Sequence, residues 1–190
     1  MFDTYLQKCI NSKKTNFEGY NYFTMTEFLE ALYSSKRSET IPEEYDLFGK
    51  LIGEWSILWI DNFGNETPRT VKGEWIFAWV LNGTAIQDLF IVPSREERLQ
   101  HTYPDAEFGT TLRIFNPQTL AWDIFYGCTG TCFRLTAYQV GDEIVLTENT
   151  AGKMRYIFSG ITANEFQWRK ECMDENGHYT VVAKVIAKRK

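Results

Sequence analysis

The chain has 190 residues, of which 44% are hydrophobic and 24% charged. These proportions are typical of globular proteins and exclude a disordered or fibrous chain. The length predicts one domain with one core. A net charge of −5 gives no cationic field to attract a polyanion, so we expect no nucleic-acid partner.

The apolar runs are short compared with the roughly 20 residues of a membrane helix, and residues 1–14 lack the apolar stretch of a signal peptide. We therefore expect a cytoplasmic protein without a membrane partner. Four cysteines in such a chain predict reduced thiols rather than a disulfide framework. They are Cys9, Cys128, Cys132 and Cys172.

The sequence contains no spacing of ligands that would suggest a metal site. Cys128 and Cys132 flank a Gly-containing turn without further Cys or His nearby, which does not make a zinc site, and whether they pair with each other stays open. His101 and His178 stand in a loop and at a strand start, where surface histidines are expected. We expect neither a metal nor a cofactor.

The first quarter of the chain has a helical pattern. A capping-box start followed by apolar residues at helical spacing predicts a helix over residues 24–33. Pro42 and the acidic residues after it predict a second short helix running into Leu51. We expect residues 1–48 to form a helical extension packed on a barrel domain of residues 49–190.

From residue 53 onward the hydrophobic period becomes two, and turn residues separate short alternating runs. This pattern predicts a mainly β fold, an antiparallel up-and-down β-barrel of about eight to ten strands with one or two N-terminal helices. The aromatic content of 16% also favours strands. The ten expected strands cover residues 53–61, 70–81, 85–92, 109–116, 121–126, 131–140, 143–148, 154–159, 165–172 and 178–187.

Two of these strands carry the same motif, Gly-Glu-Trp-x-x-x-Trp, at residues 53–59 and 73–79. At period two the large aromatic side chains of each strand share one face. Such a ladder either fills the hydrophobic core or lines a cavity, and both interpretations stay open. The candidate wall residues are Trp55, Trp59, Trp75, Phe77 and Trp79.

The same face also carries a carboxylate. If residues 82–83, Asn-Gly, form a tight turn, then Phe77 faces Asp88 and Trp75 faces Phe90. A carboxylate inside an aromatic face must be paired, hydrogen-bonded or protonated. The candidate partners are Arg113, Arg134, Arg155 and Arg169.

Arg113 is the preferred partner, because parity places it on the same face as Phe115. A two-residue turn at 117–118 sets Arg113 opposite Trp122, with Tyr126 further along that face. Asp88, Arg113 and Tyr126 are therefore the candidate polar groups of a cavity. A structural salt bridge, or exposure after a one-residue register slip, is the alternative.

Several segments resemble known barrel proteins. Residues 42–55, ending in Gly53-Glu54-Trp55, resemble the Gly-x-Trp entry of calycins, which include lipocalins, fatty-acid-binding proteins and nitrobindins. Residues 154–158, 164–168, 174–177 and 187–189 look like the last three strands of an uncharacterised bacterial family of lipocalin-like barrels. The resemblance covers residues 43–190. It implies a barrel in which Trp55 packs across the closed end beneath Arg189.

These observations predict binding of a small apolar or aromatic ligand inside the barrel. One alternative is a barrel enzyme, a lyase or isomerase, in which Asp88 or Tyr126 transfers a proton while Arg113 stabilises an anion. Another is a filled barrel that acts as a protein-interaction module. A homodimer is compatible with each of them.

Overall fold

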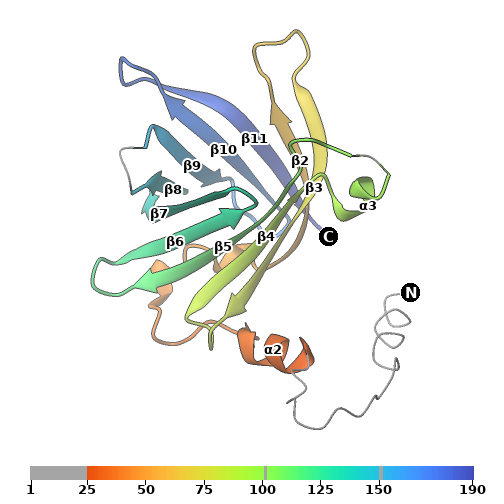
Figure 1. The fold of residues 1–190 in the computed structure, drawn as a ribbon. Helices are drawn as coiled ribbons and strands as arrows, with labels where there is room; N and C mark the ends of the chain where they lie inside the picture. The colour runs from red at the N-terminus through yellow and green to blue at the C-terminus, as the bar shows by residue number, and fades with distance from the viewer. Residues whose placement is uncertain (1–24, 101, 150–151) are drawn as a thin grey trace, which may run out of the picture. The chain divides into compact units, whose positions relative to one another are not determined.

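The chain forms a closed antiparallel barrel of ten strands (Figure 1). The computed structural model describes residues 25–100, 102–149 and 152–190. All ten expected strands are present, with ends shifted by at most two residues. They are β2 (Gly53–Asp61), β3 (Arg69–Val80), β4 (Ala85–Val92), β5 (Glu107–Asn116), β6 (Ala121–Cys128), β7 (Thr131–Val140), β8 (Glu143–Glu148), β9 (Met154–Ser159), β10 (Glu165–Met173) and β11 (Tyr179–Arg189).

The strands follow one another around the barrel in chain order. Each strand from β2 to β10 pairs with the strand that follows it in the sequence, and β2 pairs with β11 to complete the ring. Every pairing is antiparallel, so the expected up-and-down barrel is confirmed. A further two-residue strand, β1 (Tyr33–Ser34), pairs with β3 beyond the point where β2 begins.

The predicted register of β3 and β4 is confirmed. Trp75 lies opposite Phe90, and Phe77 lies opposite Asp88. The connection of residues 81–84 includes positive φ angles at Leu81, Asn82 and Gly83, a conformation that Asn and Gly adopt most readily.

The predicted register of β5 and β6 is wrong by two residues. Arg113 lies opposite Ile124 instead of Trp122, because the connection has four residues between the paired Asn116 and Ala121. The side chain of Asn116 accepts hydrogen bonds from the backbone N–H groups of Gln118 and Thr119, which stabilises this longer turn. A shift of two residues keeps every side chain on its predicted face.

The helix predicted over residues 24–33 is observed as α2 (Met25–Leu32). The second helix is instead two separate 3-10 turns, η1 (Glu43–Tyr45) and η2 (Gly49–Leu51). Asp46 interrupts them, because its Oδ1 accepts from the N–H of Gly49 at 2.9 Å and holds a bend there. Residues 1–24 of the predicted extension lie outside the described residues, and its packing as a whole stays a prediction.

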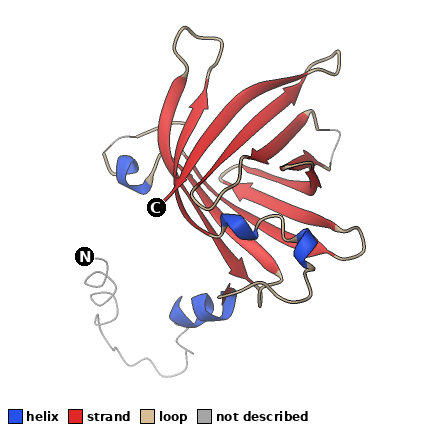
Figure 2. Cartoon of the chain, turned by 180° about the vertical axis from the view of Figure 1, so that it is seen from behind, coloured by secondary structure: helices blue, strands red, loops and turns tan. Residues whose placement is uncertain are grey.

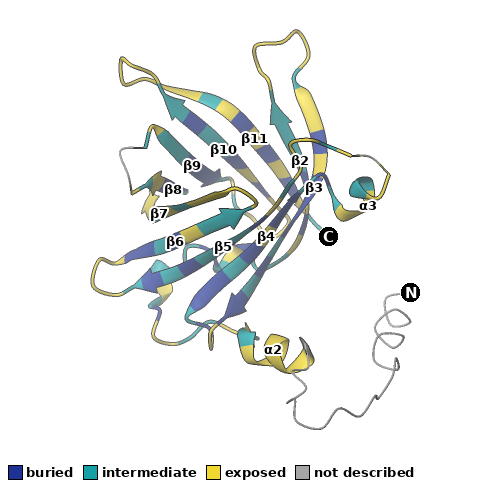
Figure 3. Ribbon diagram, viewed as in Figure 1, coloured by how far each residue is buried: buried dark blue, intermediate teal, exposed yellow. Residues whose placement is uncertain are grey.

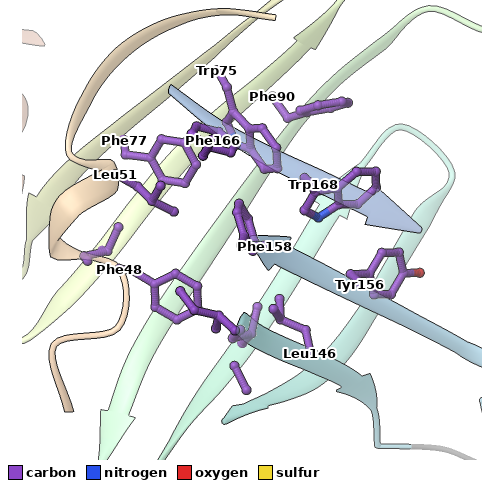
Figure 4. Close-up of a cluster of buried hydrophobic side chains, with 14 of the residues drawn as sticks. Phe48, Leu51, Trp75, Phe77, Phe90, Leu146, Tyr156, Phe158, Phe166 and Trp168 are labelled. Carbon is purple, nitrogen blue, oxygen red and sulfur yellow. The ribbon is translucent and has the colours of Figure 1, made fainter. Parts of the chain in front are cut away.

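Residues 31–190 form one compact unit, and within it the segment of residues 41–51 closes one end of the barrel. Figure 2 shows η1 and η2 crossing that end. Ile41, Phe48 and Leu51 are each at most 1% exposed. They pack against the inward aromatic side chains of the strands, as Figure 4 shows for Leu51 beside Phe77.

Trp55 anchors the same end from β2. It is fully buried, and its Nε1 donates to the carbonyl of Leu51 at 2.7 Å. The guanidinium carbon of Arg189 lies 4.1 Å from the centre of the Trp55 ring, and Arg189 donates to the carbonyls of Ile52 and Lys50. The predicted packing of Arg189 over Trp55 is confirmed.

The solvent exposure of the residues changes from one end of the barrel to the other. The connections between β2 and β3 and between β10 and β11 are exposed at the opposite end, whereas burial concentrates toward the closed end (Figure 3). The connection between β4 and β5 contains a four-residue helix, α3 (Arg95–Arg98), that contacts β3. None of the helices in the described residues is long and apolar enough to cross a membrane.

Candidate functional site

The half of the barrel away from residues 41–51 holds a cavity of about 280 Å³. The cavity forms there because the inward side chains meet no plug of the kind that fills the closed end. Its inner part is bounded by Trp75, Arg113, Leu146 and Phe158. Toward the open end its wall includes Trp59, Phe90, Glu107, Tyr126, Cys128, Thr131, Phe133, Tyr156, Trp168 and Lys170.

Aromatic rings form a continuous wall around this cavity. On one side Tyr126, Phe133 and Tyr156 stack with ring centres 4.8 and 6.0 Å apart. The series continues through Trp168 to Trp59, with 5.9 Å at each step. These rings come from strands β6, β7, β9, β10 and β2, so strand pairing alone brings them into one belt.

A buried ion pair lies at the inner end of the cavity. Nη1 of Arg113 donates to Oδ2 of Asp88, and the two side chains are 2% and 0% exposed. The guanidinium also packs against aromatic rings, with its carbon 5.0 Å from the centre of Phe48 and 5.3 Å from that of Phe77. Burial lowers the pKa of Arg113 to about 9, so it stays cationic at neutral pH.

Two hydrogen-bond donors of cavity-lining residues have no acceptor. Nε of Arg113 and Nε1 of Trp75 are buried, and neither finds a partner among the described residues. Oδ1 of Asp88 is also unpaired. Buried polar atoms are nearly always hydrogen-bonded, because an unpaired donor costs roughly 1–3 kcal/mol. All three atoms are also closed to solvent, so they do not open into the cavity.

A second polar group lies near the mouth. The hydroxyl of Tyr126 donates to Oε1 of Glu107. Burial raises the pKa of Glu107, although the Tyr126 hydrogen bond and nearby Lys170 oppose that effect. Burial, with contributions from Cys128 and Glu107, raises the pKa of Tyr126. Both groups therefore lose their protons at a higher pH than they would in water.

Glycine makes room for this pair. A Cβ at Gly109 would lie 2.9 Å from the hydroxyl oxygen of Tyr126, closer than carbon and oxygen normally approach. Gly109 is on the inward face of β5 between Glu107 and Thr111, and its missing side chain leaves the space that the Tyr126 ring occupies. Larger residues at position 109 would displace this ring.

An outer pocket of about 210 Å³ adjoins the mouth. It shares Trp59, Phe90 and Glu107 with the inner cavity. Arg69 bridges Asp61 of β2 and Asp105 of the β4–β5 connection, with 2.6 Å for each ion pair. The cavity and the outer pocket thus meet at these three shared residues, and the ion pairs of Arg69 border the outer pocket.

The residues predicted from the sequence divide between the two halves of the barrel. Trp59, Trp75, Arg113 and Tyr126 line the cavity. Trp55 and Phe77 are part of the filled core, and Trp79 pairs with β1 at the closed end. Asp88 touches the cavity only through its ion pair with Arg113.

Sequence reasoning missed most of the wall opposite β2 and β3. Phe133 and Trp168 alternate with more polar neighbours, so parity identifies them as inward residues, whereas Tyr156 is followed by the buried Ile157 and shows no such alternation. The expected strand starts at Gly109 and leaves out Glu107, which is the first residue of β5. Its spacing of two from Gly109 was the signal that could have included it.

Cys128 and Cys132 lie on opposite faces of the β6–β7 hairpin. Cys128 is opposite Thr131 and lines the cavity, whereas Cys132 is opposite Gly127 and is exposed. Side chains on opposite faces of a hairpin point apart, which prevents a disulfide between them in this fold. Within the described residues, no cluster of three or more His, Cys, Asp or Glu side chains is arranged to hold a metal.

Comparison with known proteins agrees with the fold. No family model matches the chain. No curated protein sequence matches it either. The crystal structure of Rv2717c from M. tuberculosis is similar, with a TM-score of 0.50 and 11% identity over 79% of this chain and 99% of that chain. At this identity the similarity shows a common fold alone, the antiparallel β-barrel.

Proposed function

We propose that the barrel binds a small, mostly apolar aromatic molecule in its open half. The observation that carries this proposal is the cavity of about 280 Å³ with its continuous aromatic belt. Cavities that bind small molecules are concave and mainly apolar, with a few converging polar groups. Here Arg113 and Glu107 are such groups toward the two ends of a space whose wall is largely aromatic.

We also infer a calycin-like relationship for the barrel. The packing of Arg189 over Trp55 and the closure of that end by residues 41–51 support it. In such an arrangement one end is sealed and structural, so a ligand enters from the other. The position of the cavity at the end away from Trp55 fits this arrangement.

Obstruction of the cavity mouth tests the proposal. Thr131→Trp adds a large side chain at the wall of the mouth, whereas Cys132→Trp adds the same side chain on the outer face of the same strand. Binding of naphthalene derivatives is followed by protein NMR and by quenching of tryptophan fluorescence. We expect Thr131→Trp to weaken binding at least tenfold and Cys132→Trp to leave it unchanged. Equal affinities in both variants would place binding outside the cavity.

Native mass spectrometry of protein purified from its host is the complementary measurement. A retained small molecule in one-to-one ratio would identify the natural ligand after release under denaturing conditions. We expect its loss from the Thr131→Trp variant and its retention by Cys132→Trp. The two variants therefore separate a cavity ligand from a surface contaminant.

A second candidate function rests on the Tyr126–Glu107 hydrogen bond. A carboxyl with a raised pKa beside a tyrosine, inside a cavity, is a suitable arrangement for proton transfer in a lyase or isomerase. Glu107 suits this role better than Asp88, because Asp88 is already paired with Arg113. Loss of turnover in Glu107→Gln, with ligand affinity retained, would favour the enzyme over a pure binding protein.

A further inference from the structure

We propose that Trp59 is a fixed partition between the inner cavity and the outer pocket, and that it determines the length of ligand that the barrel accepts. This inference rests on the proposed function, because it names the side chain that decides which aromatic molecules fit the same cavity. It assigns a compact ligand, such as a naphthalene, without an extension that reaches into the outer pocket.

The Trp59 ring lies between the two spaces. Trp59 and Phe90 line both the inner cavity and the outer pocket, and their ring centres are 5.9 Å apart at an angle of 65°. Beyond these rings, Val71 and Val92 belong to the wall of the outer pocket. A side chain that borders two neighbouring spaces separates them, so the two rings stand between the inner cavity and the two valines.

Hydrogen bonds hold the Trp59 ring in this position. Its Nε1 donates to Oδ2 of Asp61 at 2.8 Å, and Arg69 donates to both oxygens of that carboxylate, at 2.9 Å from Nε and 2.6 Å from Nη2. Asp61 follows Trp59 by two residues on β2 and pairs with Arg69 of β3, so the three share the inward face. The hydrogen bonds from Arg69 hold the pKa of Asp61 below its usual value, which keeps it an acceptor at neutral pH.

Packing holds the same ring from two sides. Phe90 is 7% exposed and packs in turn against Trp75, with ring centres 4.9 Å apart. Trp168 approaches Trp59 from β10, with ring centres 5.9 Å apart. A large ring that is both hydrogen-bonded and packed between other rings has few alternative rotamers. The partition is therefore a fixed part of the wall.

The volumes show what the partition determines. The inner cavity of about 280 Å³ is just below the roughly 300–1,000 Å³ that is typical of small-molecule pockets. The outer pocket would add about 210 Å³ if the two were joined. With Trp59 in place, the inner cavity takes a compact ligand. A small side chain at position 59 would join the spaces and accommodate a longer one.

A compact and an elongated probe test the inference. 2-Naphthol is the compact probe, and 6-phenyl-2-naphthol extends the same molecule by one ring along its long axis. Trp59→Ala should allow the outer pocket to bury this extra ring. We expect the elongated probe to gain at least about tenfold in affinity relative to 2-naphthol, compared with the ratio in wild type, in line with burial of one aromatic ring. Calorimetry measures both affinities.

Trp168→Ala is the matched control. It removes the same side chain from the inner cavity, and Trp168 is not among the residues that border the outer pocket. Protein NMR locates the extra ring of the elongated probe. In Trp59→Ala we expect contacts between this ring and the methyl groups of Val71 and Val92. In wild type and in Trp168→Ala we expect none.

Arg69 is tested as a positioning residue. Arg69→Met leaves the indole in place and removes the group that orients Asp61. We expect faster hydrogen exchange of the Trp59 indole N–H and a shift of the affinity ratio by at least twofold toward the elongated probe. Arg95→Met is the control, because Arg95 is a similarly exposed arginine that pairs with Glu74 on the outer side of β3. Neither readout should change in it.

The possible results separate the two proposals. An unchanged affinity ratio in Trp59→Ala, or contacts of the extra ring with Val71 and Val92 in wild type, would overturn the inference and leave the binding function standing. The wild-type measurement decides even if Trp59→Ala does not fold. No change of either readout in Arg69→Met would overturn the role of Arg69. Failure of 2-naphthol to bind wild type would overturn the proposed function itself, and the inference with it.

Discussion

The two halves of the barrel are built from the same kind of strand and have different interiors. In the closed half, Phe48 packs edge to face against Trp122 and Phe158, and buried indoles donate to backbone carbonyls. In the open half, equally large rings such as Tyr156 surround a cavity. The difference comes from residues 41–51, which fill one end. An inward aromatic ladder therefore becomes core or cavity wall according to what the rest of the chain places against it.

The largest expected effect is at the boundary of the two halves. Arg113→Met should lower the free energy of unfolding by about 3–5 kcal/mol, because it leaves the buried Asp88 carboxylate unpaired. Urea denaturation followed by tryptophan fluorescence measures it. The double variant Arg113→Met with Asp88→Leu removes both charges and should recover most of the loss. A double variant as unstable as the single one would show that the ion pair itself stabilises the fold.

A comparison of tryptophans sharpens the contrast between the halves. Trp55→Phe should cost about 1–3 kcal/mol, because it breaks a buried hydrogen bond and leaves the Leu51 carbonyl without that donor. Trp59→Phe should cost less, about 1 kcal/mol or below, since Trp59 and its partner Asp61 are partly exposed. The same denaturation experiment applies. Equal costs would mean that the closed end is no better packed than the mouth.

Two carboxyl groups should give opposite pH dependence. In the folded protein the pKa of Glu107 is raised above its usual 4.5 by burial, so the stability that this group contributes is present at low pH and lost as pH rises through its folded pKa. Glu74, on the outer side of β3, has its pKa lowered to about 2 by hydrogen bonds from Arg95 and Lys190, despite its burial. Its contribution is present above pH 4.5 and lost as pH falls toward 2.

Stability curves of Glu107→Gln and Glu74→Gln between pH 3 and pH 8 measure this contrast. Relative to wild type, Glu107→Gln should gain stability as pH rises from 4 toward 8. Wild type should lose its advantage over Glu74→Gln as pH falls from 5 to 3. A flat difference for either variant would contradict the assigned direction of its pKa shift.

The smallest expected effect is a difference in thiol reactivity. Cys128 lines the cavity and Cys132 lies on the outer face of the hairpin. A bound aromatic probe should slow alkylation of Cys128 by iodoacetamide several-fold and leave Cys132 unaffected, as measured by peptide mass spectrometry. Equal protection of both thiols would indicate a change of the whole hairpin rather than occupancy of the cavity.

Much of the fold was predictable because alternation and turn chemistry are local signals. The Asn-Gly pair at residues 82–83 led to the correct opposition of Phe77 and Asp88, and from it to the pairing of Asp88 with Arg113. The four-residue turn after Asn116 was missed, because its stability depends on side-chain hydrogen bonds that Pro-Gln at 117–118 does not reveal. The register error was two residues, and side chains alternate between faces with a period of two, so each side chain stays on its predicted face.

The candidate site was less predictable. Parity assigns Trp55 and Trp59 to one face but says nothing about which end of the barrel each one reaches, and only Trp59 lines the cavity. That distinction depends on where residues 41–51 fold back. The opposite wall, with Phe133 and Trp168, is set by strand pairings around the whole ring rather than by any local pattern.

The pairing of β2 with β11 has a consequence for how the chain folds. Every other pairing in the ring joins two strands that are consecutive in the sequence. Arg189 of β11, by contrast, contacts the carbonyl of Ile52, which lies 137 positions earlier. Closing so long a loop costs the most chain entropy. We therefore expect β2 and β11 to pair last, after the successive hairpins have formed. The cavity would then exist only after the slowest step of folding, and an unclosed intermediate would expose the aromatic belt to solvent and to other chains.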